Sequence, residues 1–325
     1  MEGTIQTVLG TIKAADLGRT LTHEHLCLDF EGFYSPPPNH LEEYFAGPIT
    51  LEKVGFLRQY PYSSKYNLTF NDDETLSSLI IDIHEYLRSG GLTIVENSSH
   101  GLSRRADKMK TLSEKTKVNI VAGTGFYVSS TQKESTLKMS VEEMADLIRK
   151  ELTEGCIEDP SVKCGFIGEV GSSWPIDAFE KKAIQASAAI QEELKCPVSF
   201  HPGRNEKAPF EILRIHLEAG GRKDKTVMSH LERTITSEAL LADFADLGSF
   251  CQFDLFGTEC SYYQLNPSID MPSDAQRLDK IEFGGHGYCH INNNIIPKMR
   301  LKGISNDDIE SITVKNPAQW LASSF

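Results

Sequence analysis

The sequence lacks the features of a membrane, secreted or nucleic-acid-binding protein. No apolar run approaches the roughly 18 residues that cross a bilayer, and the N-terminus has no basic region followed by an apolar stretch. Positive charge is in short supply, because 33 Lys and Arg face 46 Asp and Glu, which gives a net charge of -13 and a pI near 5.3. We therefore expect a cytoplasmic protein whose partner is a small-molecule substrate, with no nucleic acid and no membrane as partner.

Cysteine pairs with the spacing of metal or redox sites are also missing. The seven cysteines are odd in number and scattered, and no CxxC occurs. Most lie in apolar stretches, which favours reduced, buried thiols over disulfides or a cysteine-based zinc site. Repeats, low-complexity segments and dividing linkers are absent as well. Since 325 residues is a normal length for one α/β barrel, we predict a single domain over residues 1–325.

What the sequence does contain is an alternation of short apolar or β-branched runs with helix-like stretches. This alternation predicts βα units around a parallel sheet, in an α/β fold of the (β/α)8 TIM-barrel type. Glycine pairs at 90–91 and 220–221 stand where helix C-caps return the chain to a strand. The predicted strands are Thr20–Leu26, Leu92–Glu96, Asn119–Gly123, Cys164–Val170, Pro197–His201, Thr226–His230 and Phe250–Leu255. The predicted helices are Asp73–Arg88, Val141–Glu154, Ala178–Leu194, Ala208–Ala219, Ser237–Leu247 and a shorter Asp274–Phe283.

The count of strands is one short of a closed barrel. Seven strands are recognisable, whereas this type of barrel needs eight. Between Phe283 and the last helical region, Asn306–Leu321, the only candidate is Ile291–Ile296, and its three consecutive asparagines make it a poor strand. We therefore predict an incomplete barrel in which strand eight is missing.

A long insertion follows the first predicted strand, at about residues 30–71. It contains three consecutive prolines and several aromatic residues. In a barrel such a segment lies over the C-terminal rim, where a lid or a pocket wall belongs. An irregular surface excursion is the open alternative.

The first sign of chemistry is His23-Glu24-His25, near the end of the first predicted strand. Residues i and i+2 of a strand point to the same face, so both imidazoles are expected to project inward. Neutral imidazole is a favoured ligand of zinc and similar ions. Two nearby histidines also occur by chance, so this motif alone does not define a site.

Two more histidines and a glutamate end other predicted strands. His201 closes the run CPVSFH, His230 closes TVMSH, and Glu169 ends the fourth strand in GFIGEVG. Barrel active sites are built from residues at these strand ends. A glutamate inside an apolar strand needs a cationic partner. That partner is either a pair of metal ions that the carboxylate bridges or a salt-bridge mate such as Lys163 or Arg204. Together, the four histidines and the glutamate predict a divalent metal centre.

Seven longer stretches carry further information: LGRTLTHEHL, GTGFYV, KCGFIGEVG, SFHPGR, TVMSHLERT, DLFGTE and GGHGY. In these stretches, and over its whole length, the chain resembles the phosphotriesterase-related group of the phosphotriesterase family, in the amidohydrolase superfamily. By this resemblance His23 and His25 bind a first metal ion, and His201 and His230 bind a second. Glu169 takes the bridging position, which in bacterial phosphotriesterases is a carboxylated lysine.

The resemblance also implies an activity and cofactors. It implies two divalent metal ions, with zinc as the expected metal, and a metal-bridging hydroxide that attacks a small amide or ester. N-acyl amino acids such as N-acetyltaurine are the expected substrates. Organophosphate or lactone hydrolysis is an alternative, which the replacement of the bridging lysine by Glu169 disfavours.

One ligand of the family pattern is missing. Family members carry an aspartate at the end of strand eight, shortly before GGHGY, which binds the first metal and accepts a proton from the attacking water. Here Phe283 runs directly into Gly284, so a segment of about 25 residues, the share of one βα unit, is absent. Asp254 is not expected to replace it because it belongs to the strand-seven stretch DLFGTE, so no catalytic residue is assigned. We expect weak metal binding and little activity; a non-catalytic product that keeps the fold is the competing hypothesis.

Two residues are candidates for substrate contact. Arg204, next to a predicted metal ligand in HPGR, could pair bidentately with a carboxylate or sulfonate, or it could form a structural salt bridge. Tyr127, in GTGFY, could line the pocket or be an ordinary core aromatic. A homo-oligomer is also open.

Overall fold

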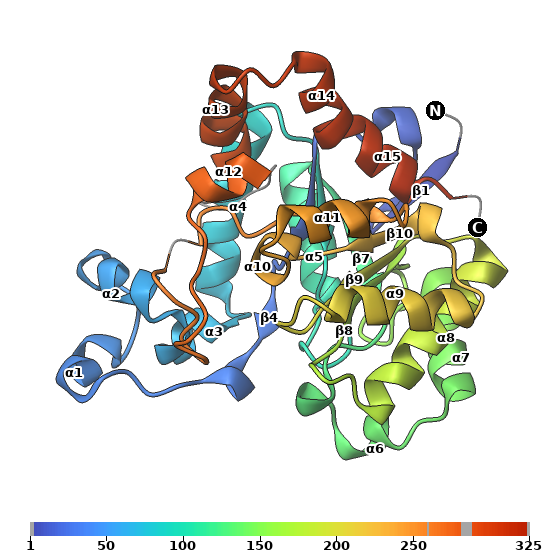
Figure 1. The fold of residues 1–325 in the computed structure, drawn as a ribbon, viewed down its shortest axis with the longest axis horizontal. Coiled ribbons are helices and arrows are strands. Elements are labelled where there is room, and N and C mark those ends of the chain that lie inside the picture. Colours follow the sequence, from blue (N-terminus) through green and yellow to red (C-terminus); the bar gives the residue numbers. More distant parts are fainter. Residues whose placement is uncertain (1–2, 259, 281–287, 324–325) are drawn as a thin grey trace.

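A curled sheet of seven parallel strands forms the centre of the molecule (Figure 1). The computed structural model describes residues 3–258, 260–280 and 288–323. The strands lie in the order β11-β10-β9-β8-β7-β6-β3, and every neighbouring pair is parallel. Their bounds are β3 (Thr20–Glu24), β6 (Thr93–Glu96), β7 (Asn119–Thr124), β8 (Phe166–Gly171), β9 (Val198–His201), β10 (Thr226–Met228) and β11 (Phe250–Cys251). The predicted α/β fold of TIM-barrel type is confirmed.

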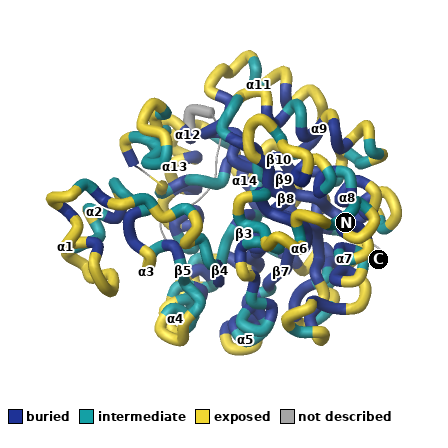
Figure 2. Tube along the Cα trace, turned by 90° about the horizontal axis from the view of Figure 1, so that it is seen from below, coloured by how far each residue is buried: buried dark blue, intermediate teal, exposed yellow. Residues whose placement is uncertain are grey.

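Helices cover the outer face of this sheet. Figure 2 shows the buried strands inside and helices whose outer sides are exposed. Helix α8 begins with a capping box between Asp177 and Glu180, which satisfies free N–H groups of its first turn. Gly90 and Gly220, both at φ +94°, follow α4 and α9 in the left-handed conformation that favours glycine, as the sequence predicts. The long helices are α4 (Asp73–Arg88), α5 (Ala106–Thr116), α7 (Val141–Thr153), α8 (Ala178–Leu194), α9 (Ala208–Glu218) and α11 (Glu238–Ala245).

A hairpin and the last helix cover the N-terminal ends of the central strands. The hairpin joins β1 (Thr4–Thr7) to β2 (Gly10–Lys13), and the amide of Val8 donates to the carbonyl of Ile120 at the start of β7. Trp320 of α15 (Asn316–Leu321) packs edge-on against Phe166, with ring centroids 5.6 Å apart. This end of the sheet is therefore a packed core, and the opposite end is free for a site.

The insertion after β3 forms part of that opposite end. β4 (Leu28–Asp29) pairs with β5 (Thr69–Phe70), and three short α-helices and several 3-10 turns lie between them. Gln264 ties the insertion to the loop after β11, because it accepts from the amide of Tyr62 and donates to the hydroxyl of Ser63. The short helices of the insertion are α1 (Glu42–Phe45), α2 (Val54–Gln59) and α3 (Lys65–Leu68). The remaining ones are α6 (Glu134–Leu137), α10 (Leu231–Thr234), α12 (Asp274–Lys280), α13 (Ile296–Leu301) and α14 (Asn306–Glu310).

The two edges of the sheet are β3 and β11, and within the described residues no eighth strand lies between them. Instead, Gln252 connects the edges through its side chain. Its Nε2 donates to Thr22 Oγ1 of β3 at 2.5 Å, and its Oε1 accepts from Ser229 Oγ, just after β10, at 2.7 Å. Seven strands thus enclose the interior, as predicted, and one buried amide spans the place where backbone pairing is missing.

Several predicted boundaries are wrong in detail. The predicted strand Thr226–His230 ends at Met228, because His230 has φ +58°, a conformation that does not continue a strand. The predicted strand Phe250–Leu255 is shorter in the structure, where β11 spans Phe250–Cys251. In the described sheet β11 pairs only with β10. Helix α5 was not predicted, and Ile291–Ile296 is helical, as expected for a poor strand. Part of the predicted helix Asp274–Phe283, and the Phe283–Gly284 junction, lie outside the described residues.

The described residues also bear on the predicted thiols and on membrane spans. All seven cysteines are free, and five of them, Cys27, Cys156, Cys164, Cys196 and Cys260, are buried, whereas Cys251 is exposed. None of the helices in residues 3–258, 260–280 and 288–323 combines the length and the apolar character that a membrane span needs.

Candidate metal centre

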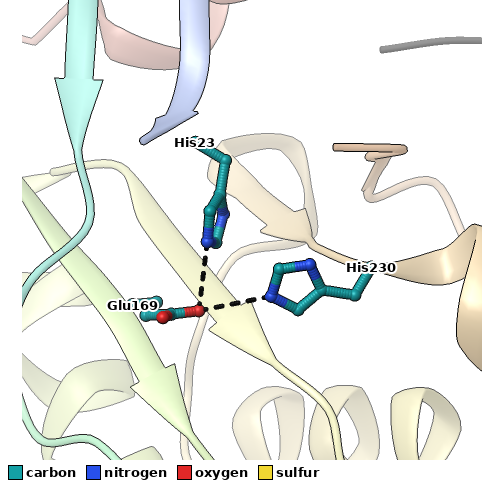
Figure 3. Close-up of side chains that lie close together, drawn as sticks. All are labelled: His23, Glu169 and His230. Atoms are coloured by element: carbon teal, nitrogen blue, oxygen red, sulfur yellow. Dashed lines mark ion pairs between the residues drawn. The ribbon is translucent and has the colours of Figure 1, made fainter. Parts of the chain in front are cut away.

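Five predicted site residues meet at the carboxyl ends of four strands. His23 belongs to β3, and His25 follows the end of that strand. Glu169 lies in β8, His201 is the last residue of β9, and His230 comes two residues after β10. Figure 3 shows His23, Glu169 and His230 pointing toward one another from these separate elements. The sequence therefore predicts which side chains come together.

Glu169 is the centre of this cluster, because its carboxylate contacts all four imidazoles. Its Oε2 lies 2.9 Å from His201 Nδ1, 3.2 Å from His23 Nε2 and 3.5 Å from His230 Nε2. Its Oε1 lies 3.3 Å from His25 Nε2. The partner of this buried carboxylate is thus the histidine cluster, and neither Lys163 nor Arg204 forms an ion pair with it in the structure.

Electrostatics in the cluster favour a charged glutamate. Burial works against the charged form, but the fields of His201 and His23 hold the pKa of Glu169 well below its usual range. Burial also opposes protonation of His23, yet the carboxylates of Glu169 and Asp254 outweigh it and raise the pKa of His23 to about 9. For His201, burial dominates over the attraction of Glu169 and lowers the pKa to about 3. Without a metal, a proton is therefore favoured on His23 and disfavoured on His201.

The donor set fits a divalent metal ion. Ligand atoms of His23, Glu169 and His230 all lie within 4.8 Å of one another. The Nε2 atom of His23 is buried and faces Glu169 Oε2 at 3.2 Å without the geometry of a hydrogen bond, so an ion could take the place of its proton. Imidazole nitrogens with a carboxylate are ligands that zinc and related ions prefer. Because His25 faces one oxygen of Glu169 and the other three histidines face the second, the carboxylate is placed to bridge two positions.

Asp254 is a member of the site that the sequence interpretation missed. It lies just beyond β11, and its Oδ1 is 2.5 Å from Nδ1 of His230, while its Oδ2 is 3.5 Å from Nδ1 of His23. These are the nitrogens that face away from Glu169, so Asp254 supports the two rings from behind and does not replace the missing strand-eight ligand. A carboxylate in this position fixes the tautomer and orientation of a ligand histidine. The available signal was the same as for Glu169, a buried charge at the end of an apolar strand.

A cavity of about 830 Å³ opens above the cluster. Residues of the insertion form part of its wall. Tyr127 lines the cavity, with its hydroxyl 3.3 Å from His201 Nε2, and is 4% exposed. Arg204 lines it too, with its guanidinium carbon 3.5 Å from the centre of the Tyr263 ring. The insertion contributes Phe30, Phe33, Pro61, Tyr62, Asn67, Leu68 and Phe70.

Arg233, three residues after His230, is a second arginine in this cavity and was not predicted. Its Nη2 lies 3.2 Å from His201 Nε2 and donates to the carbonyl of Pro202 at 3.2 Å. The side chain is almost fully buried. Its place in the sequence, within HLERT next to a predicted ligand, was the only signal that could have found it.

Comparison with known proteins identifies the chain. The model of the phosphotriesterase family matches residues 3–321. A phosphotriesterase-related protein of Aedes aegypti is 51% identical, over 98% of each chain. A resiniferatoxin-binding protein from Rhodobacter sphaeroides has a similar structure, with a TM-score of 0.91 at 28% identity over 98% of this chain and 95% of that one. A mutant organophosphorus hydrolase from Deinococcus radiodurans shares the fold, with a TM-score of 0.76 at 22% identity over 99% and 98% of the chains.

The curled parallel sheet with a histidine and glutamate cluster at its carboxyl-end rim is the architecture of an α/β-barrel hydrolase. This chain belongs to the phosphotriesterase family, a family of hydrolases. Its alignment with the Aedes aegypti relative extends over 349 positions. That exceeds the 325 residues of this chain by 24, so at least 24 aligned positions have no counterpart here. This length agrees with the predicted loss of one strand and its flanking segment.

Proposed function

We propose that this protein is a metal-dependent amidase or esterase of the phosphotriesterase-related type, acting on small N-acyl amino acids such as N-acetyltaurine. The observation that carries the proposal is the position of Glu169 between four histidines, below a cavity that contains an arginine. We propose two divalent ions, with zinc as the metal, one held by His23 and His25 and the other by His201 and His230, with Glu169 as the shared carboxylate. The free thiols favour the reducing cytoplasm as the location.

Each group of residues at the site would have its own role in the proposed hydrolysis. When bound, the ions would supply Lewis-acid activation of a water molecule and of the scissile carbonyl. Asp254 would hold the proton on His230 Nδ1, which leaves Nε2 free as a ligand. Aromatic side chains of the insertion would exclude bulk water from the cavity, and Arg204 would pair with a carboxylate or sulfonate of the substrate.

A competing candidate is a product that keeps the fold and has little activity. One observation favours it: within 4 Å of the four imidazoles, the carboxylates of the described residues are Glu169 and Asp254 alone, and both already serve the histidines. A separate proton acceptor, the role of the strand-eight aspartate, is therefore without a candidate in this part of the chain.

Metal analysis and hydrolysis assays separate the two candidates. Purified protein loaded with zinc is expected to hold about two ions per chain if both positions bind, and a His201→Asn variant should hold fewer. N-acetyltaurine hydrolysis is then compared with that of a version in which the strand-eight segment of the Aedes aegypti relative is inserted between residues 283 and 284. Activity only after insertion supports the impaired product, and equal activity of both versions supports an enzyme that works without the aspartate.

Substrate choice is tested in the same assay. An organophosphate triester and a lactone serve as alternatives to N-acetyltaurine. If either of them is hydrolysed and no N-acyl amino acid is, the amidase assignment is wrong while the hydrolase assignment holds. If the inserted version hydrolyses none of the three, the proposed function fails.

A further inference from the structure

Arg233 is a buried cation that no carboxylate neutralises directly. It is 9% exposed, and among the described residues no Asp or Glu oxygen lies within ion-pair distance of it or of Arg204. A buried charge is costly without a partner. The cavity thus contains two guanidinium groups that form no ion pair within the described residues, although the protein as a whole carries a net charge of -13.

The protein uses only part of the hydrogen-bonding capacity of Arg233. A guanidinium has five N–H donors. The structure gives Arg233 three acceptors, namely Pro202 O and His201 Nε2 for Nη2 and, at a long 3.4 Å, Thr234 Oγ1 for Nη1. At least two donors therefore remain for a ligand in the cavity that Arg233 lines.

The surroundings of Arg233 disfavour its role as a mere structural cation. Arg204 lines the same cavity and adds a second positive charge to its wall. The nearby Glu232 gives no direct compensation, since its Oε1 accepts from the backbone amides of Asp254 and Leu255. Asp254 is negatively charged but is already bonded to His230. Two arginines that repel each other at the wall of a cavity are stabilised when an anion binds between them.

The position of Arg233 next to His201 means that an anion held there lies close to the proposed metal centre.

We propose that Arg233, together with Arg204, forms the anion-binding subsite of this pocket and selects acylated amines whose carboxylate or sulfonate lies only a few bonds from the scissile amide. Arg233 is the inner contact, beside the histidine cluster, and Arg204, stacked on Tyr263, is the second one. This inference rests on the proposed function and deepens it, because it names the feature of the substrate that the pocket recognises.

Binding of simple anions tests the subsite without any need for turnover. Zinc-loaded wild-type protein and variants are titrated calorimetrically with ethanesulfonate and with propionate, which distinguish the two anion types, and with ethanol as the neutral probe. The wild type should bind at least one anion and not ethanol. Arg233→Met should weaken anion binding at least about tenfold, the effect of losing one charged hydrogen bond. Arg233→Lys should restore part of the loss.

Two controls separate recognition from structure. Arg222→Met removes a surface arginine that pairs with Asp224 outside the cavity, and it should leave binding unchanged. Zinc content and thermal unfolding are measured for every variant, because Arg233 contacts His201. If wild-type protein binds neither anion, or if Arg233→Met binds as tightly as wild type at equal zinc content, the proposal is overturned.

Kinetics of an active version distinguish this proposal from the proposed function. N-acetyltaurine is compared with N-acetylethanolamine, which carries a hydroxyl in place of the sulfonate. We expect Arg233→Met to raise KM for N-acetyltaurine more than it lowers kcat, and to leave N-acetylethanolamine unaffected. Arg233-dependent anion binding without any amide hydrolysis supports the subsite and refutes the amidase; hydrolysis of both amides with equal kcat/KM supports the amidase and refutes the subsite.

Discussion

At the scale of single residues, the orientation and charge of the histidines in the candidate metal centre depend on two buried carboxylates, which approach the imidazole rings from opposite sides. Glu169 faces the nitrogens that would bind metal, and Asp254 faces the remote nitrogens of His230 and His23. The sequence identified the first of these carboxylates, because its strand is long and apolar. It did not identify the second, because Asp254 was considered only as a substitute for the strand-eight ligand and not as a support for the histidines.

Asp254→Asn is expected to weaken zinc binding about tenfold to a hundredfold, the usual cost of losing a carboxylate that orients a ligand histidine. The amide could no longer hold the proton on His230 Nδ1 with a full negative charge. Competition titration with a zinc chelator measures the change, and Asp243→Asn, at an exposed position of α11, is the matched control. Equal zinc affinity of both variants would show that Asp254 does not position the ring.

His216 makes the fold sensitive to acid at a site remote from the metal centre. It is fully buried on α9, its Nε2–H donates to Gln191 at 2.8 Å, and its Nδ1 has no partner in the described part of the chain. Burial lowers its pKa to about 4. Below pH 6.5 this histidine is protonated in the unfolded chain but stays neutral in the folded chain. The free energy of unfolding therefore decreases as the pH is lowered from 6.5 to about 4.

His216→Gln is therefore expected to resist mild acid better than wild type. Between pH 6.5 and pH 5 the wild type should lose about 2 kcal/mol more of its free energy of unfolding than the variant does. Urea unfolding at both pH values measures this difference. An identical loss in the two proteins would mean that other groups cause the acid sensitivity.

At the scale of elements, prediction succeeded where the pattern is strong and failed where tertiary contacts decide. Helices α4 and α8 have their predicted bounds, because each begins at a capping aspartate and shows a regular apolar face. Helix α5 was missed because its buried apolar residues, Ala106, Met109 and Leu112, form only a narrow stripe among polar and charged neighbours. The end of β10 was misplaced because the left-handed backbone at His230 has no signature in the sequence.

Helix α7 should depend measurably on its N-terminal capping box. Ser140 accepts from the amide of Glu143, whose side chain accepts in return from the amide of Ser140. Ser140→Ala should lower the free energy of unfolding by about 1 kcal/mol, and Ser140→Asp should not. Urea unfolding compares the variants, and zinc content should stay constant in both, since α7 lies outside the metal centre.

At the scale of the whole molecule, the side chain of Gln252 links β3 to the chain just after β11 across the open edge of the sheet. Gln252→Leu leaves the hydroxyl of Thr22 and the buried hydroxyl of Ser229 without this partner and should cost about 1–3 kcal/mol of stability. It should also accelerate amide hydrogen exchange in β3 and β11 more than in β7, β8 and β9, which have a strand on each side. Gln319→Leu, at an exposed position, is the control. Uniform acceleration in all strands would show that Gln252 does not specifically hold the edges.

The division of the pocket between two kinds of support has a consequence for how this protein can evolve. The histidines, Glu169 and Asp254 are fixed to strand ends, whereas Phe30, Phe33 and Tyr62 are carried by an insertion that takes no part in the central sheet. Mutations in the insertion can change the size and shape of the accepted acyl group without disturbing the ligands. Adaptation to a new substrate and preservation of the reaction chemistry are therefore largely independent tasks in this fold.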